Sequence, residues 1–363
     1  MGRSIVLQAT THRVRKSHLG LDQMTGHLNV GVVGCGLIGS RRAFEASGHP
    51  KTRLVKVADL DRDRAAKLAS EYGCEPVSDW IQVVKDASID VVVVSTPNAY
   101  IAPIAIAALE HGKNVLVEKP PGRNLAEASS IAAAASRTNK AILKVGFNHR
   151  YHPAILQAYK LYKQGLIGKA INVRARYGHG GRPGYEGEWR GSIDLAGGGE
   201  LTDQGVHVVD LLNWFLGGPE SAFCMLQTAL WPIAPLEDNA FALLRFKSGA
   251  IASLHTSWTQ WKNLFSLEIF GELGALCVEG LAGSYGDQRL TISLRKAQGG
   301  APDTTEEVFR GPDSSWALEW EDFVSAILEA RSYFGTPQEG RAAMATIDAL
   351  YRSARCGQLV SFN

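Results

Sequence analysis

The sequence has few cysteines, almost no net charge and no long apolar run, and each shortage excludes a class of protein. Its five cysteines are scattered without a C-x-x-C pair, which argues against a disulfide framework and against a zinc site. The formal net charge is +2 over 363 residues, so nothing indicates binding to nucleic acid or to an anionic membrane. No apolar run approaches the roughly 18 residues that a membrane-spanning helix needs. We therefore expect a cytoplasmic protein with reduced thiols and no bound metal.

The first residues also lack an apolar core, so they do not resemble a secretory signal. Residues 1–27 are basic and polar, and we expect a disordered extension there, or a true start of translation at Met24. The rest of the chain has ordinary apolar content and is too long for one domain. We predict a dinucleotide-binding domain over residues 28–150 and a substrate-binding and oligomerisation domain over residues 151–363.

A glycine motif follows the first strand-like run and organises this prediction. Residues 28–39 read L-N-V-G-V-V-G-C-G-L-I-G. In such a strand–turn–helix, Gly34 permits the tight turn, Gly36 lets the backbone approach a pyrophosphate, and Gly39 lets the helix pack closely on the strand. The helix amides, with Leu37 and Ile38 between the glycines, then face the phosphates. The segment predicts a dinucleotide site.

An acidic residue ends the second predicted strand, which covers residues 53–58. Asp59 stands 20 residues beyond Gly39, where this fold places the carboxylate that binds the adenosine ribose. A carboxylate repels a 2′-phosphate, so Asp59 favours NAD over NADP. The alternative is that Asp59 only caps the helix expected from residue 62 to residue 72.

Strand and helix patterns alternate up to residue 147, which indicates parallel βαβ units and a Rossmann domain. Small polar residues end the strand at 90–95, and a charged pair ends the strand at 114–117. Ligands of parallel sheets bind at these carboxyl ends, so the expected cofactor contacts are Ser95, Thr96, Pro97, Asn98, Glu118, Lys119 and Pro120. Lys119 is suited to donate a hydrogen bond to a nicotinamide ribose or a substrate hydroxyl. A solvated surface lysine is the alternative.

Strand-like runs crowd the second half of the chain from residue 170 onward, without helices between them. Such crowding predicts an α+β domain with a large, mostly antiparallel open sheet. Amphipathic helices are expected at residues 314–331 and 338–354, and they can pack back on the first domain.

Two stretches supply candidate substrate contacts. Polar residues follow the last Rossmann strand, and a long glycine-rich segment at 178–199 carries arginines and a tryptophan, which favours a lid or a substrate wall. The candidates are Asn148, Arg150, Arg182, Trp189 and Arg190.

A second chemical centre lies in residues 197–210, where three glycines open a helix expected to run to Leu216. Asp203 and His207 are four residues apart, which puts both side chains on one helix face. Three interpretations are open. The pair is an acid–base couple in which Asp203 orients His207, part of a metal site with Glu200 and Asp210, or a surface pair of little consequence.

In order and spacing, these motifs resemble those of the glucose–fructose oxidoreductase / inositol dehydrogenase / MocA (Gfo/Idh/MocA) family, from residue 29 to the C-terminus. The resemblance implies hydride transfer between NAD(P) and a ring carbon of a sugar or cyclitol. It implies that Lys119 contacts the substrate hydroxyl and the nicotinamide ribose. It also implies that Asp203 and His207 complete the catalytic set, with His207 as the general acid/base, and that no catalytic metal takes part. One face of the open sheet commonly forms the oligomer interface in this family.

We therefore expect an NAD(H)-dependent oxidoreductase that acts on a secondary alcohol of a sugar, sugar nucleotide or cyclitol, in a homo-oligomer (dimer or tetramer). Two alternatives share the fold. One is a glycoside hydrolase or epimerase that retains and recycles NAD, and the other is a nucleotide-sensing regulator without catalysis.

Overall fold

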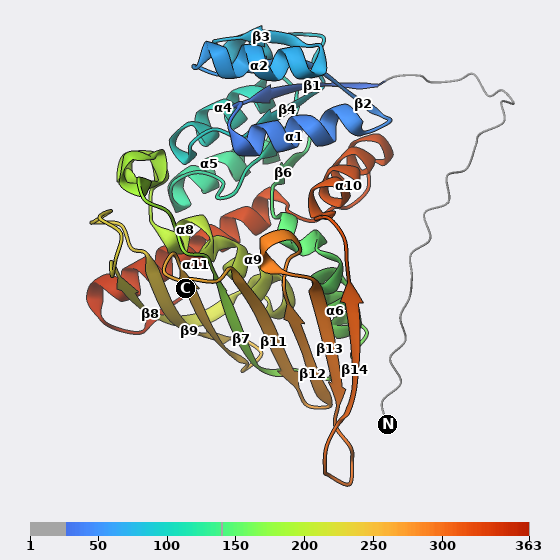
Figure 1. Ribbon diagram of the computed structural model, residues 1–363, viewed down its shortest axis with the longest axis vertical. Helices are drawn as coiled ribbons and strands as arrows, with labels where there is room; N and C mark the ends of the chain where they lie inside the picture. Colours follow the sequence, from blue (N-terminus) through green and yellow to red (C-terminus); the bar gives the residue numbers. More distant parts are fainter. Residues whose placement is uncertain (1–26, 139–140, 363) are drawn as a thin grey trace, which may run out of the picture.

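The computed structural model describes residues 27–138 and 141–362, and these form two β-sheets with helices packed between and around them (Figure 1). The extension expected at residues 1–27 lies, apart from His27, outside the described residues. No helix among the described residues is long and apolar enough to cross a membrane.

The first sheet has six strands in the order β3-β2-β1-β4-β5-β6, and every neighbouring pair is parallel. Its strands are β1 (Leu28–Val33), β2 (Thr52–Ala58), β3 (Glu75–Val77), β4 (Val91–Val94), β5 (Asn114–Val117) and β6 (Leu143–Val145). Helices α1 (Leu37–Gly48), α2 (Arg62–Tyr72), α3 (Ile81–Val84), α4 (Asn98–Glu110) and α5 (Leu125–Ser136) connect them. This is the predicted Rossmann topology. The strand order reverses between β1 and β4, which opens a crevice at their carboxyl ends.

The turn between β1 and α1 leaves no room for a side chain at Gly34 or at Gly39. A β-carbon on Gly39 would lie 1.7 Å from the carbonyl oxygen of Gly34, so only glycine lets α1 sit this close to β1. Gly34 itself has φ of +97°, a conformation that favours glycine, and it packs against the backbone of Ser95.

The second sheet has nine strands in the order β14-β13-β12-β11-β7-β10-β9-β8-β15. They are β7 (Ala170–Gly178), β8 (Pro219–Gln227), β9 (Asn239–Phe246), β10 (Ile251–Ser257), β11 (Leu264–Gly271), β12 (Gly274–Glu279), β13 (Gln288–Leu294), β14 (Asp303–Phe309) and β15 (Val360–Ser361). Among the described strands of this sheet, β7 and β10 are the one parallel pair, and the remaining neighbours are antiparallel. The large, mostly antiparallel sheet is thus confirmed.

Helices cover one face of this sheet and leave the other face open (Figure 1). The covering elements are the 3₁₀ helix η1 (Asn148–Tyr151), α6 (Pro153–Lys163), α8 (Glu200–Asp203), α9 (Gly205–Leu216) and α11 (Pro337–Cys356). Between β7 and α8 lie η2 (Tyr185–Gly187), η3 (Trp189–Gly191) and α7 (Ile193–Ala196), and η4 (Gly283–Tyr285) joins β12 to β13. The division at residue 150, which falls inside η1, stays a prediction.

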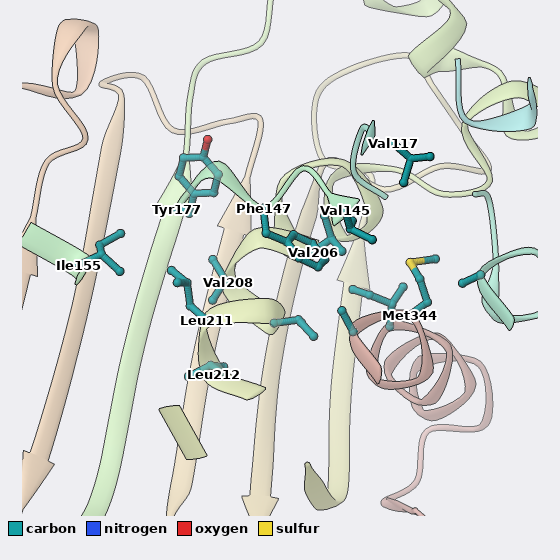
Figure 2. Close-up of a cluster of buried hydrophobic side chains, with 14 of the residues drawn as sticks. Val117, Val145, Phe147, Ile155, Tyr177, Val206, Val208, Leu211, Leu212 and Met344 are labelled. Carbon is teal, nitrogen blue, oxygen red and sulfur yellow. The ribbon is translucent and has the colours of Figure 1, made fainter. Parts of the chain in front are cut away.

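The C-terminal helices join the two sheets into one core. Figure 2 shows Val117 and Val145 of the first sheet close to Met344 of α11, within the same buried cluster as Leu211 of α9. The helix α10 (Ser315–Glu329) buries Trp320 in a second cluster, together with strands β1 and β4.

A buried arginine fixes α1 against both the end of β5 and α10. The guanidinium of Arg42 pairs with Glu118 at 2.6 Å and with Glu319 at 2.7 Å, and its side chain is fully buried. Its charge also lies over the ring of Trp316. Burial raises the pKa of Glu319, and the charge of Arg42 opposes that shift.

Removing that cation should therefore lower the urea concentration at which the protein unfolds. We expect Arg42→Met to lower the free energy of unfolding by about 3–5 kcal/mol, because it leaves two buried carboxylates unpaired. The measurement is urea unfolding followed by circular dichroism. Arg289→Met, which breaks the exposed Arg289–Glu306 pair, is the control and should cost less than about 1 kcal/mol. Equal losses in the two variants would contradict this role of Arg42.

Candidate active site

A cavity of about 450 Å³ lies between the two sheets, at the carboxyl ends of the Rossmann strands. The first domain contributes Leu37, Ser95, Thr96, Glu118 and Lys119 to its wall. The second half of the chain contributes Asp203, Gln204 and His207. The predicted catalytic groups and part of the predicted cofactor contacts, from distant parts of the sequence, therefore face one space. The predicted cofactor contacts that do not line it are Gly34, Gly36, Gly39, Asp59, Pro97 and Pro120.

A second cavity, of about 700 Å³, adjoins the glycine turn and extends toward α2, where Arg64 and Lys67 line it. Gly36 lines this cavity, and a β-carbon placed on it would meet nothing within 4 Å. No side chain caps the N-terminus of α1, so its first amides are free of side-chain acceptors. Open space, uncapped amides and a helix N-terminus are what a pyrophosphate requires, so these residues fit a dinucleotide.

Asp59 lies beside this turn, and its carboxylate is held by backbone amides. It accepts from the amide of Cys35 at 2.7 Å and from the amide of Asp61 at 2.9 Å. Asp61, not Asp59, caps α2, because its side chain accepts from the amides of Asp63 and Arg64. The alternative that Asp59 only caps α2 is therefore wrong, and its contact with a ribose stays a prediction.

The residues that end β4 have unequal freedom to contact a ligand. The hydroxyl of Ser95 donates to the carbonyl of Gly34. The side-chain amide of Asn98 is buried and donates to the carbonyl of Ala196. Pro97 is the N-cap residue of α4. Thr96 lines the cavity that contains Asp203 and His207, and its hydroxyl has no hydrogen-bond partner. Of the residues that end β4, it is therefore the one with a side-chain donor free for a ligand.

An ion-pair chain crosses the cavity from the first sheet to the second. The amine of Lys119 lies 3.0 Å from Oδ1 of Asp203 and also donates to the Asp203 carbonyl at 2.6 Å. The other carboxylate oxygen, Oδ2, accepts from Nε of Arg190 at 3.0 Å. Burial raises the pKa of Asp203, but the charges and hydrogen bonds of Lys119 and Arg190 outweigh it, so the net shift is downward and the carboxylate stays ionised.

His207 lies in the first turn of α9, but Asp203 does not orient it. The expected continuous helix is interrupted at Gln204, and both carboxylate oxygens of Asp203 are taken by cations. The Nδ1 atom of His207 is buried without a partner, and the ring stacks on His149 with centroids 3.8 Å apart. Burial, then the charge of Lys119, lowers the pKa of His207 well below its usual value. The imidazole is therefore neutral at pH 7.

Four of the five expected substrate contacts line the cavity: Asn148, Arg182, Trp189 and Arg190. Arg150 does not, which corrects that expectation. Its guanidinium is buried and pairs with Asp210 at 2.6 Å and with Glu339 at 2.5 Å, so it joins α9 to α11. Because Asp210 is committed to this pair, it cannot complete the metal site considered from the sequence. Among the described residues, no group of three His, Cys, Asp or Glu side chains could hold a metal ion.

Several aromatic and imidazole side chains in the wall carried no prediction. They are His149, His152, Tyr177, His179, Tyr185 and Tyr285. The run N-H-R-Y-H-P after β6 was the signal in the sequence that could have identified His149 and His152. Tyr285 comes from the turn η4 between two strands, and only the packed sheet places it at the cavity.

Comparison with known proteins defines the class first. Residues 28–147 match the family described as "Oxidoreductase family, NAD-binding Rossmann fold", and residues 155–277 match the "GFO/IDH/MocA C-terminal domain". A Rossmann domain and this second domain together make an NAD-binding oxidoreductase. The chain belongs to the GFO/IDH/MocA family.

Similar curated proteins include sugar and cyclitol dehydrogenases. Levoglucosan dehydrogenase of Pseudarthrobacter phenanthrenivorans is 29% identical over 69% of this chain and 73% of its own length. Inositol 2-dehydrogenase of Rubrobacter xylanophilus is 25% identical over 90% and 91%. The solved structure of a levoglucosan dehydrogenase complexed with NADH superposes with a TM-score of 0.85 at 25% identity, over 93% of this chain and 99% of that one.

The buried histidines predict how stability depends on pH. Burial lowers the pKa of His152 to about 4, although Asp313 at 3.7 Å raises it, whereas the unfolded residue titrates near its ordinary value. Between pH 7 and pH 5 the unfolded chain gains a proton that the folded state does not bind. His152 therefore lowers the free energy of unfolding by about 2 kcal/mol over this interval.

We expect the His152→Asn variant to lose that much less stability than the wild type between pH 7 and pH 5. Urea unfolding at both pH values measures the difference. Parallel losses in the two proteins would show that His152 is not held neutral by the fold.

Proposed function

We propose that this protein transfers a hydride between NAD(H) and a secondary alcohol or ketone carbon of a sugar, sugar derivative or cyclitol. The observation that carries the proposal is that Lys119, Asp203 and His207 face one cavity, beside a glycine turn with open space for a dinucleotide. The dehydrogenases named above act on sugars and cyclitols, which supports this substrate class.

The cofactor, when bound, supplies or accepts the hydride, and NAD fits better than NADP because Asp59 borders its site. The glycine turn and the N-terminus of α1 would hold the pyrophosphate. Thr96 and Lys119 would hold the nicotinamide end, since both line the cavity that contains Asp203 and His207.

His207 is the proposed general acid/base. Because its imidazole is neutral, it can take the proton of the substrate hydroxyl during oxidation and return it during reduction. Lys119 donates a hydrogen bond to the same oxygen and stabilises the negative charge that develops there. Asp203 holds Lys119 and Arg190 by ion pairs, which keeps the lysine amine in place. This role replaces the orientation of His207 that the sequence favoured.

Replacing His207 by Ala should lower the turnover number by about 10²–10⁴-fold, because general acid/base help is worth that much. NADH affinity should stay close to that of the wild type, since the glycine turn is untouched. The assay is NADH production at 340 nm with a panel of anhydrosugars, inositols and aldoses. It also separates a dehydrogenase from an NAD-retaining hydrolase or epimerase, which gives no net NADH.

The matched control is His111→Ala, an exposed histidine at the end of α4. It should leave turnover unchanged. Normal turnover in His207→Ala would rule out the general acid/base role. Failure of the wild-type protein to bind NADH at all would rule out the proposed function.

We also propose that the protein is a homo-oligomer and that the open face of the second sheet forms the interface between its subunits. Along these strands, every second side chain is buried under the helices and the others face solvent on the open face. Several of the solvent-facing side chains are apolar, among them Met225 at 64%, Leu243 at 52% and Phe241 at 47% exposure. Cross-strand pairing places Met225 opposite Phe241 and Phe223 opposite Leu243, so they form one patch. A second copy of this chain would cover it. All five cysteines are free, which supports a location in the cytoplasm.

Leu243→Glu should therefore lower the mass measured by light scattering from that of an oligomer to that of a monomer. A charge at the centre of an apolar interface is desolvated without a partner. Leu318→Glu, at a similarly exposed leucine of α10, is the control and should keep the wild-type mass. A wild type that is monomeric at high concentration, or an oligomeric Leu243→Glu, would exclude this interface.

A further inference from the structure

Two stacked histidines form part of the wall of the cavity that contains the catalytic groups, and the proposed mechanism uses only one of them. His149 lies in η1 and His207 lies in α9. Their ring centroids are 3.8 Å apart and their ring planes differ by 22°. Each residue is only 5% exposed, and both line the cavity. Their neighbours Phe147 and Val206 are fully buried in the core cluster of Figure 2, which anchors the chain beside each histidine.

The ring of His207 depends on aromatic contacts for its orientation. Its Nδ1 atom is buried without a hydrogen-bond partner. Asp203, the partner that the sequence favoured, has both carboxylate oxygens engaged by cations. The ring of His149 covers one face of the His207 ring, and the ring of Tyr177 lies farther away, at 6.3 Å between centroids. Among the described aromatic rings, that of His149 is therefore the one placed to fix the plane of His207.

His149 is itself held by a short hydrogen-bond chain. Its Nδ1 atom lies 3.3 Å from Oδ1 of Asn148, and the side-chain nitrogen of Asn148 donates to the hydroxyl of Ser315 at 3.0 Å. An amide oxygen can only accept, so the neutral ring of His149 carries its proton on Nδ1. The ring also packs at 65° against the rings of Tyr177 and Phe265. Contacts from α10 and from strands β7 and β11 therefore fix this side chain.

The surroundings keep His149 neutral while His207 exchanges a proton. Burial lowers the pKa of His149 well below its usual value, and a charge on His207, on His152 or on Lys119 lowers it further. The pKa of His207 is lowered by burial first, then by Lys119 at the end of β5 and by His152 after η1. Tyr177 of β7 stays uncharged, because burial raises the pKa of its hydroxyl. The two stacked rings are therefore never charged together, and no like-charge repulsion separates them during the reaction.

We propose that His149 is the positioning residue of the general base: its ring fixes the plane of His207 and keeps water away from that ring. The inference rests on the proposed hydride transfer, in which His207 takes the proton of the substrate hydroxyl. It gives His149 the part that the sequence assigned to Asp203. His149 itself neither gains nor loses a proton, so the stack stays intact in both protonation states of His207.

The first test follows the ring of His207 directly and needs neither substrate nor cofactor. Histidine labelled with ¹³C at Cε1 gives an NMR signal for each ring, and the signal missing from His207→Ala identifies His207. In the wild type this signal should stay that of a neutral ring as the pH is lowered to about 5, because burial keeps the pKa of His207 low. His149→Ala admits water to the ring face, so the signal should titrate at a pH about one unit higher or more. His149→Phe keeps a flat ring there and should titrate like the wild type.

The matched control is His111→Ala, at the exposed histidine that ends α4, and it should leave the His207 signal unchanged. Thermal unfolding of each variant checks that the fold is intact. If His149→Ala does not fold, His149→Gln makes the same test, since glutamine fills much of the space but offers no ring.

The second test separates positioning from substrate binding, because His149 also lines the cavity. With a substrate from the panel that the wild type oxidises, His149→Ala should lower the turnover number by about 10- to 100-fold, since a displaced base loses its alignment with the hydroxyl. The KM should change by less than about three-fold. The acidic limb of the pH profile of kcat should move upward together with the NMR titration. His149→Phe should restore most of the turnover number.

The outcomes separate this inference from the proposed function. If His207 titrates alike in the wild type and in His149→Ala, the positioning role is excluded while the oxidoreductase stands. If His149→Phe is as impaired as His149→Ala and both raise the KM, His149 is a substrate contact and the inference is wrong. If the wild-type protein does not bind NADH, the proposed function itself fails.

Discussion

The ion pair between Lys119 and Asp203 is the contact on which the active site depends, because its two partners come from different halves of the chain. Lys119 ends the fifth strand of a parallel sheet, and Asp203 ends a short helix that lies on the other sheet. Neither half holds a catalytic set by itself. Asp203 also binds Arg190, so one carboxylate organises a cation from each side of the cavity. That double pairing keeps the carboxylate ionised although it is buried, and it leaves His207 without an acidic partner. Burial and the charge of Lys119 then lower the pKa of His207 and keep it neutral.

Buried ion pairs hold the two halves in the orientation that this site requires. Arg42 joins α1 to α10, and Lys144 joins β6 to α10 by a pair with Asp322 at 2.9 Å. Arg150 joins η1 to α9 and α11. A buried pair adds little net stability over an apolar contact, but breaking it leaves an unpaired charge in the interior. A shift of α10 or α11 would break these pairs and is therefore costly in free energy. Apolar packing alone tolerates such a shift more easily.

Sequence reasoning succeeded where a local pattern determines the structure. The glycine turn, the β-branched strands and the alternation of strands with helices depend on neighbouring residues, and the Rossmann topology followed from them. It failed where partners are distant. Arg150 lies in a polar segment after the last Rossmann strand, which suggested a ligand contact. Only the fold brings its true partners, Asp210 and Glu339, to it. Strand β14 is mostly polar and exposed at a sheet edge, so its sequence lacks the apolar pattern by which a strand is recognised. The interruption at Gln204 was missed because the apolar spacing continues through it.

The return of α10 to the first sheet has a consequence for how the protein is made. Val30 of β1 is among the first core residues to leave the ribosome, and the cluster around it is completed by Trp320 and Phe323 of α10. Translation at about 5–20 residues per second delivers these aromatic residues tens of seconds later. During that interval one face of the nascent Rossmann sheet lacks the part of its cover that α10 supplies, with only α1 and α2 packed there. The newborn chain must therefore keep an apolar surface from aggregating, and the cofactor-binding half matures only when synthesis is nearly finished.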